Sequence, residues 1–144
     1  KLNVPGDIIN DFSNTLNIAT ISIKNEDISN STDSLSTLYS YLPRFLTYAT
    51  DKKEDINLKD TKSYILTAFY NSVVNNWNNV SSYINYAIES YTPILNNLEY
   101  TKGKEHATNR IYILLNEIKN SVTTNDKDIF IINYKNIINE LNIL

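Results

Sequence analysis

His106 is the only histidine of the chain and the first residue to consider for catalysis. A catalytic triad or a histidine general base would have to be built around it. Glu105 precedes it, but adjacent residues of a helix point about 100° apart, and the first turn after Gly103 is where polar side chains usually face water. We therefore predict that His106 is exposed and that the protein is not an enzyme. Catalysis remains open only if the fold brings tyrosines, lysines or carboxylates together.

Residues that hold metals, cofactors or nucleotides are scarce. The chain has no cysteine, which excludes disulfides, thiolate zinc sites and iron–sulfur clusters. Metal sites in helical bundles commonly use Glu-x-x-His motifs, which are absent, and Glu117 and Glu140 fall outside the apolar stripes. Gly6 and Gly103 stand alone, whereas phosphate loops need several glycines. We predict no metal and no cofactor.

The charge balance also excludes classes of partner. Thirteen basic and sixteen acidic residues give a net charge of −3, with no basic cluster. Phosphate backbones and anionic lipids are bound by concentrated positive charge. We therefore predict that the chain binds neither nucleic acid nor a membrane surface, and that a membrane is reached, if at all, only through a missing N-terminal anchor.

Eleven tyrosines and one tryptophan are the residues most suited to binding a partner. Trp77 falls in an apolar stripe while the asparagines around it do not, so we interpret it as a core anchor with solvated neighbours. Three other aromatic residues, Tyr70, Tyr91 and Tyr134, also belong to core stripes. Tyr64 and Tyr86 project away from these stripes and are the predicted partner-binding residues.

Long helices must position these residues, because two glycines and three prolines are too few for the turns of a β domain. One apolar stripe runs from about 58 to 98 in steps of three and four. It consists of Leu66, Phe69, Val73, Trp77, Val80, Ile84, Ala87, Tyr91, Leu95 and Leu98. As one helix of about 40 residues it would be about 60 Å long. We predict that it forms a central spine, with a kink or an end at Pro93.

Shorter helices are predicted on either side of this spine. The first covers about 7–23, with Ile8, Phe12, Leu16, Ala19 and Ile23 on one face. The second follows the polar residues 24–32, is kinked or split at Pro43, and presents Leu35, Leu38, Leu42, Phe45 or Leu46, and Ala49. The charged residues 51–55 are interpreted as a solvated loop.

Two further helices follow Gly103 and are predicted to form an antiparallel pair. Their stripes are Ala107, Ile111, Leu114, Leu115, Ile118 and Val122, then Phe130, Tyr134, Ile137, Leu141 and Leu144. The β-branched run 129–132 is assigned to helix because the stripe continues through it. We thus predict an all-α, up-and-down bundle of four to five helices built around one long central helix (58–98), in a single domain (1–144).

The expected function is that of an extracytoplasmic binding domain. The chain begins at Lys1 and has no methionine, so we expect that upstream residues were processed off or left out. Its bias towards Ile, Asn, Lys and Tyr is typical of a low-GC bacterium. We expect an exported helical bundle, such as the soluble part of a lipoprotein or cell-surface protein, that binds a protein or a cell-envelope component.

The alternative is a cytoplasmic, oligomeric helical adaptor or regulatory protein from a phage or mobile element. Apolar residues on two faces of one helix would favour it. The predicted spine partly shows this, with Ile65, Tyr83 and Ile94 on one side of the stripe and Val74 on the other. Two flanking hairpins that cover the spine would explain the same width.

Overall fold

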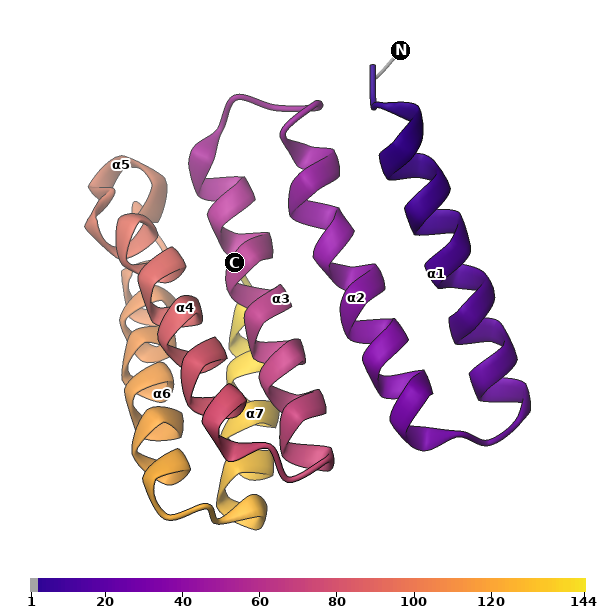
Figure 1. Cartoon of the computed structure of the whole chain (residues 1–144). Coiled ribbons are helices and arrows are strands. Elements are labelled where there is room, and N and C mark those ends of the chain that lie inside the picture. The colour runs from indigo at the N-terminus through magenta and orange to yellow at the C-terminus, as the bar shows by residue number, and fades with distance from the viewer. Residues whose placement is uncertain (1–2) are drawn as a thin grey trace.

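The computed structural model describes residues 3–144 and confirms the all-α class. Its regular elements within that range are seven α-helices. They are α1 (Gly6–Lys24), α2 (Ile28–Leu46), α3 (Lys53–Val73), α4 (Trp77–Asn96), α5 (Leu98–Thr101), α6 (Glu105–Thr123) and α7 (Lys127–Leu141). Consecutive long helices run up and down (Figure 1). The number exceeds the four to five predicted because the long central helix is divided and a short turn of helix, α5, follows it.

The predicted single helix over 58–98 is wrong, because the chain turns back at Val74–Asn76. Asn75 adopts a left-handed backbone with φ 58°, a conformation that asparagine tolerates better than most residues. The Asn76 amide donates to the carbonyl of Asn71 at 2.8 Å, and the Asn76 side chain accepts from the amide of Asn79. The asparagines that we interpreted as solvated therefore end one helix and cap the next.

The boundaries at the other breaks have similar local causes. The helix α3 begins at Lys53, earlier than predicted, with Glu54 and Asp55 in its first turn, where the helix dipole favours anions. Pro43 and Pro93 lie inside α2 and α4, each within the last turn, so neither splits its helix.

Four helices enclose the hydrophobic core. All members of the buried cluster come from α3, α4, α6 and α7: Leu58, Ile65, Ala68, Val80, Ile84, Ala87, Tyr91, Ile94, Ile111, Leu114, Leu115, Ile118, Val122, Phe130, Ile137 and Leu141. The predicted stripes of the last two long helices are thus confirmed except at Ala107, which is half-buried and lies outside the cluster. The helix α3 contacts α2, α4 and α7 and takes the central place predicted for the longer spine.

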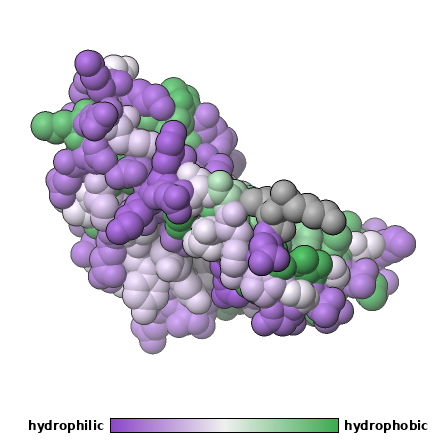
Figure 2. All heavy atoms as spheres, turned by 90° about the horizontal axis from the view of Figure 1, so that it is seen from above, coloured by the Kyte–Doolittle hydropathy of each residue, from purple (hydrophilic) through white to green (hydrophobic). Residues whose placement is uncertain are grey.

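The helices α1 and α2 form a hairpin that extends sideways from this four-helix core. In Figure 1, α1, α2, α3 and α4 stand in a row, with α6 and α7 behind α4 and α3. The view from above shows the hairpin as an arm beside a thicker lobe (Figure 2). Phe12 holds the hairpin together through edge-to-face contacts with Tyr41 and Phe45, at centroid distances of 5.6 and 5.4 Å.

Part of the predicted core of this hairpin is exposed. Leu16, Ile23, Leu35 and Leu42 were assigned to core stripes, but each has at least a third of its surface in solvent. The reason is that α1 packs mainly on α2, and α2 packs mainly on α1 and α3, so one flank of each helix stays uncovered.

Candidate partner-binding site

Tyr64 and Tyr86, the two predicted partner-binding residues, lie side by side. Their ring centroids are 5.6 Å apart. The turn at Asn75 brings them together, because Tyr64 lies nine residues before the end of α3 and Tyr86 nine residues after the start of α4. In an antiparallel pair of helices, these positions are level with each other.

Tyr83 completes what we call the tyrosine cluster, namely Tyr64, Tyr83 and Tyr86. Its ring lies 6.3 Å from that of Tyr64 and 6.0 Å from that of Tyr86. Tyr86 is 48% exposed, whereas Tyr64 and Tyr83 are half-buried and pack against the core cluster, so Tyr64 does not project away from the core as predicted. Sequence reasoning assigned Tyr83 to one side of the stripe and missed its place in the site. Its spacing of three from Tyr86 was the available signal, because residues three apart are neighbours on a helix.

The tyrosine cluster lies in a negative environment. Burial raises the pKa of Tyr64, and the nearby carboxylate of Asp60, the rings of Tyr86 and Tyr83, and Glu89 raise it further. Tyr64 is therefore a neutral phenol at pH 7. Aromatic faces attract cations, and so do carboxylates, so the surface around Tyr64 and Tyr86 favours a positively charged group.

Replacing Asp60 by asparagine should lower the pKa of Tyr64, because a negative charge that opposes phenolate formation is removed. The measurement is a pH titration of tyrosine ring carbons by NMR, with Tyr64→Phe used to assign the signal. Tyr100 is the internal control: burial and its hydrogen bond to Asp55 raise its pKa to about 12, and the variant should leave it there. A Tyr64 pKa that does not move would show that Asp60 lies too far away to act.

A groove of about 310 Å³ between α2, α3 and α4 adjoins the tyrosine cluster. Its lining is rich in hydroxyl and amide groups: Asp33, Ser36, Thr37, Ser40, Ser63, Tyr64, Thr67, Tyr70, Asn71, Asn79 and Tyr83. Sequence reasoning missed this groove, because it depends on how α2 packs against α3 and α4.

Hydrogen bonds within the helices decide what the groove offers to a ligand. The hydroxyls of Ser36, Ser40 and Thr67 donate to the carbonyls of Asp33, Thr37 and Ser63 at 2.7–3.0 Å. Each hydroxyl has one donor and two acceptor positions, so the free capacity is that of an acceptor. These three hydroxyls therefore offer acceptor oxygens to hydrogen-bond donors of a ligand.

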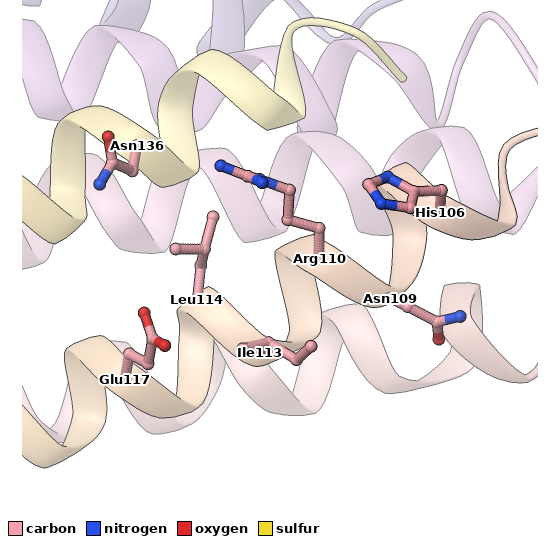
Figure 3. Close-up of a pocket in the computed structure, with 7 residues that line it drawn as sticks. All are labelled: His106, Asn109, Arg110, Ile113, Leu114, Glu117 and Asn136. Atoms are coloured by element: carbon pink, nitrogen blue, oxygen red, sulfur yellow. The ribbon is translucent and has the colours of Figure 1, made fainter.

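The surroundings of His106 are open and are shared with charged residues of α6 and α7. His106 is exposed, as predicted, and lines an open hollow of about 530 Å³ over α6 and α7. Figure 3 shows His106 and Glu117 at opposite ends of this hollow. The rise of α6 over the eleven residues from one to the other is about 16 Å along the helix axis. Arg110 pairs with Glu140 of α7 at 2.6 Å, and this ion pair joins the exposed side chain of Arg110 to the half-buried side chain of Glu140.

The tryptophan and the three tyrosines that were predicted to lie in core stripes differ in how deeply they are buried. Trp77 packs against the core, edge-on to Phe130 at 6.0 Å, which confirms it as an anchor. Tyr91 is buried and donates to the carbonyl of Thr108 at 3.1 Å, and Tyr134 packs against the core. Tyr70 is half-buried and lines the groove.

Comparison with known proteins leaves the site to be interpreted from its own geometry. No known protein family, curated protein or solved structure matches the chain. Within residues 3–144, histidine and carboxylate side chains form no group of three that could hold a metal ion. In the same part of the chain, each helix is too short or too polar to cross a membrane.

Proposed function

We propose that the chain is a non-enzymatic helical-bundle domain that binds a basic segment of another protein. The binding site is the tyrosine cluster together with the adjoining groove. The observation that carries this proposal is the combination of three clustered tyrosine rings, one of them 48% exposed, with the carboxylates of Asp60 and Glu89. Aromatic faces and carboxylates both attract guanidinium and ammonium groups.

The groove supports the same class of partner. Its serine and threonine hydroxyls present acceptor oxygens, and Asp33 adds a carboxylate at its edge. An arginine side chain carries five N–H donors and no acceptor, so it can satisfy several of these oxygens at once.

The proposed setting is the outside of a bacterial cell, with the chain as the soluble part of a lipoprotein or cell-surface protein. The support is compositional: the chain has no cysteine, and it favours Ile, Asn, Lys and Tyr. Fractionation of cells that express the full-length gene product, followed by detection with an antibody, tests this setting. Recovery in the cytoplasmic fraction would contradict it.

Titration of the ¹⁵N-labelled chain with two short peptides, followed by NMR, tests the binding function. One peptide alternates arginine with glycine and the other alternates glutamate with glycine. We expect the arginine peptide alone to shift the amide signals of α3 and α4 around the tyrosine cluster, and to bind less well as salt is added. Equal responses to both peptides would overturn the proposal.

Tyr86→Ala should weaken binding of the arginine peptide by about two- to fivefold, the loss expected for one exposed cation–π contact. Tyr86 is exposed, so its removal leaves the core intact. The matched control is Tyr112→Ala on α6, which removes an exposed tyrosine from another helix. If both variants bind as the wild type does, the tyrosine cluster is not the binding site.

A further inference from the structure

Exposed apolar side chains are concentrated on the α1–α2 hairpin, away from the tyrosine cluster. Seventeen large hydrophobic residues are exposed within residues 3–144, and eight of them lie on these two helices. On the predicted spine, by contrast, Ile65 and Ile94 are completely buried. The exposed apolar surface that would favour oligomerisation therefore lies on the hairpin and not at Ile65 and Ile94 of the predicted spine.

Six of these residues form two regular lines. Ile9, Leu16 and Ile23 follow one another at intervals of seven along α1, and Ile28, Leu35 and Leu42 do the same along α2. Residues seven apart on a helix lie on the same side, two turns from each other. We call these six residues the hairpin face. Their exposed fractions range from 39% to 71%.

Two hollows indicate that both lines lie on the same side of the hairpin. Ile23, Ile28 and Thr32 line one hollow, at the α1–α2 turn. Thr32 and Leu35 line a second hollow of about 380 Å³, which extends to Phe69 of α3 and Tyr134 of α7. Because Thr32 belongs to both, the hairpin face is continuous with an apolar hollow beside the four-helix core.

The pattern fits another pair of helices. A helix pair with apolar residues at heptad spacing buries them against a second pair, as in a four-helix bundle. The hairpin projects as an arm with hydrophobic residues at its surface, so a second molecule can approach it (Figure 2). A second copy supplies such a pair directly, because a two-fold axis places the same surface on both sides of the interface.

The apolar area of the hairpin face can also be compared with the area that a stable protein–protein interface buries. Six side chains of this kind, about half exposed, present roughly 500 Å² of apolar surface, within the range of the largest patches on monomers. Each partner of a stable complex buries ~800 Å², and the polar rim around the hairpin face can supply the difference. Covering this surface would remove most of the exposed apolar area of α1 and α2.

We propose that the hairpin face is a docking surface for a second copy of this chain, so that two α1–α2 hairpins form a four-helix bundle across a two-fold axis. This assembly is separate from the proposed binding at the tyrosine cluster. The two surfaces use different side chains, because no residue of the hairpin face lines the groove or belongs to the tyrosine cluster.

Sedimentation velocity over a range of protein concentrations tests this proposal. We expect a dimer for the wild type, strengthened by salt, because both copies carry a net charge of −3. The double variant Leu16→Glu, Leu35→Glu should weaken dimerisation by about a hundredfold or more, because it places charges in an apolar contact. Both positions are exposed in the single chain, so circular dichroism should show an unchanged helix content.

Two controls separate this interface from non-specific association. Ile113→Glu introduces a charge at an exposed isoleucine of α6 and should leave the dimer intact, as should Tyr86→Ala. Because the chain has no cysteine, Leu35→Cys and Ile113→Cys each introduce one thiol. Mild oxidation should then link Leu35→Cys dimers more efficiently. A wild type that stays monomeric, or an Ile113→Glu variant that dissociates equally, would overturn the proposal.

Discussion

Replacing Phe130 by alanine should lower the free energy of unfolding by about 3–5 kcal/mol, the usual loss when a buried phenylalanine is truncated. Phe130 is completely buried at the start of α7, where its ring meets the edge of Trp77 at 6.0 Å. Truncation removes this contact and leaves a cavity in the core beside Trp77 of α4. Since small domains are stable by only about 5–15 kcal/mol, the variant should unfold at much lower urea concentrations.

Urea denaturation followed by circular dichroism and by fluorescence of Trp77, the only tryptophan, measures this loss. Ile132→Ala is the control on the same helix, because Ile132 is largely exposed and its truncation should change stability by less than about 0.5 kcal/mol. Equal losses of stability in the two variants would show that Phe130 is not more deeply buried than Ile132.

Replacing Lys62 by methionine should stabilise the protein by about 1 kcal/mol at neutral pH, because a buried charge is exchanged for an apolar chain of similar length. Lys62 is buried on α3, and its ammonium donates to the side-chain oxygen of Asn142 at 3.2 Å. Lys62 is not a member of the ion pair found within residues 3–144, which joins Arg110 to Glu140. Asn142 is exposed, so its oxygen can bind water once the lysine is gone.

The gain should depend on pH in a defined direction. Burial, and to a smaller extent the charge of Lys59, lower the pKa of Lys62 in the folded protein below the ordinary value of 10.5. Between the folded and unfolded pKa values the unfolded chain binds more protons, so the wild type gains stability as the pH rises there. The advantage of Lys62→Met should therefore be full below the folded pKa and shrink towards pH 10.5.

Urea denaturation of both proteins at several alkaline pH values checks this dependence, and the difference between them removes the contribution of the tyrosines. Lys119→Met is the matched control, because Lys119 is exposed on α6 and its charge is already solvated. A Lys62→Met variant that is less stable than the wild type would show that the hydrogen bond to Asn142 outweighs the cost of burial.

The helical class followed directly from composition and periodicity, whereas the break in the long helix did not. A stripe with steps of three and four is the same for one straight helix and for two helices joined by a turn that keeps the apolar residues in step. Val73 and Trp77 flank the break and are both half-buried, so the stripe passes through it without a gap. The run of asparagines around Asn75 was the local signal, because asparagine tolerates a left-handed backbone.

The candidate sites were predictable to different degrees. Tyr64 and Tyr86 could be selected because they leave the apolar stripe, but their contact depends on the turn at Asn75. The hairpin face could not be recognised in the same way. Leu16 and Leu35 have the periodicity of core residues, and only the arrangement of helices decides whether such a stripe faces the core or solvent.

The order of the helices also determines when the core can close. Contacts of α1 with α2, of α2 with α3 and of α3 with α4 join successive helices, so these pairs can form as the chain emerges from the ribosome. The contact of α3 with α7 joins helices that are distant in sequence, and α7 supplies Phe130, Ile137 and Leu141 to the core. A nascent chain therefore leaves part of the apolar face of α3 uncovered until α7 has been synthesised, so the core closes only after the last helix is complete.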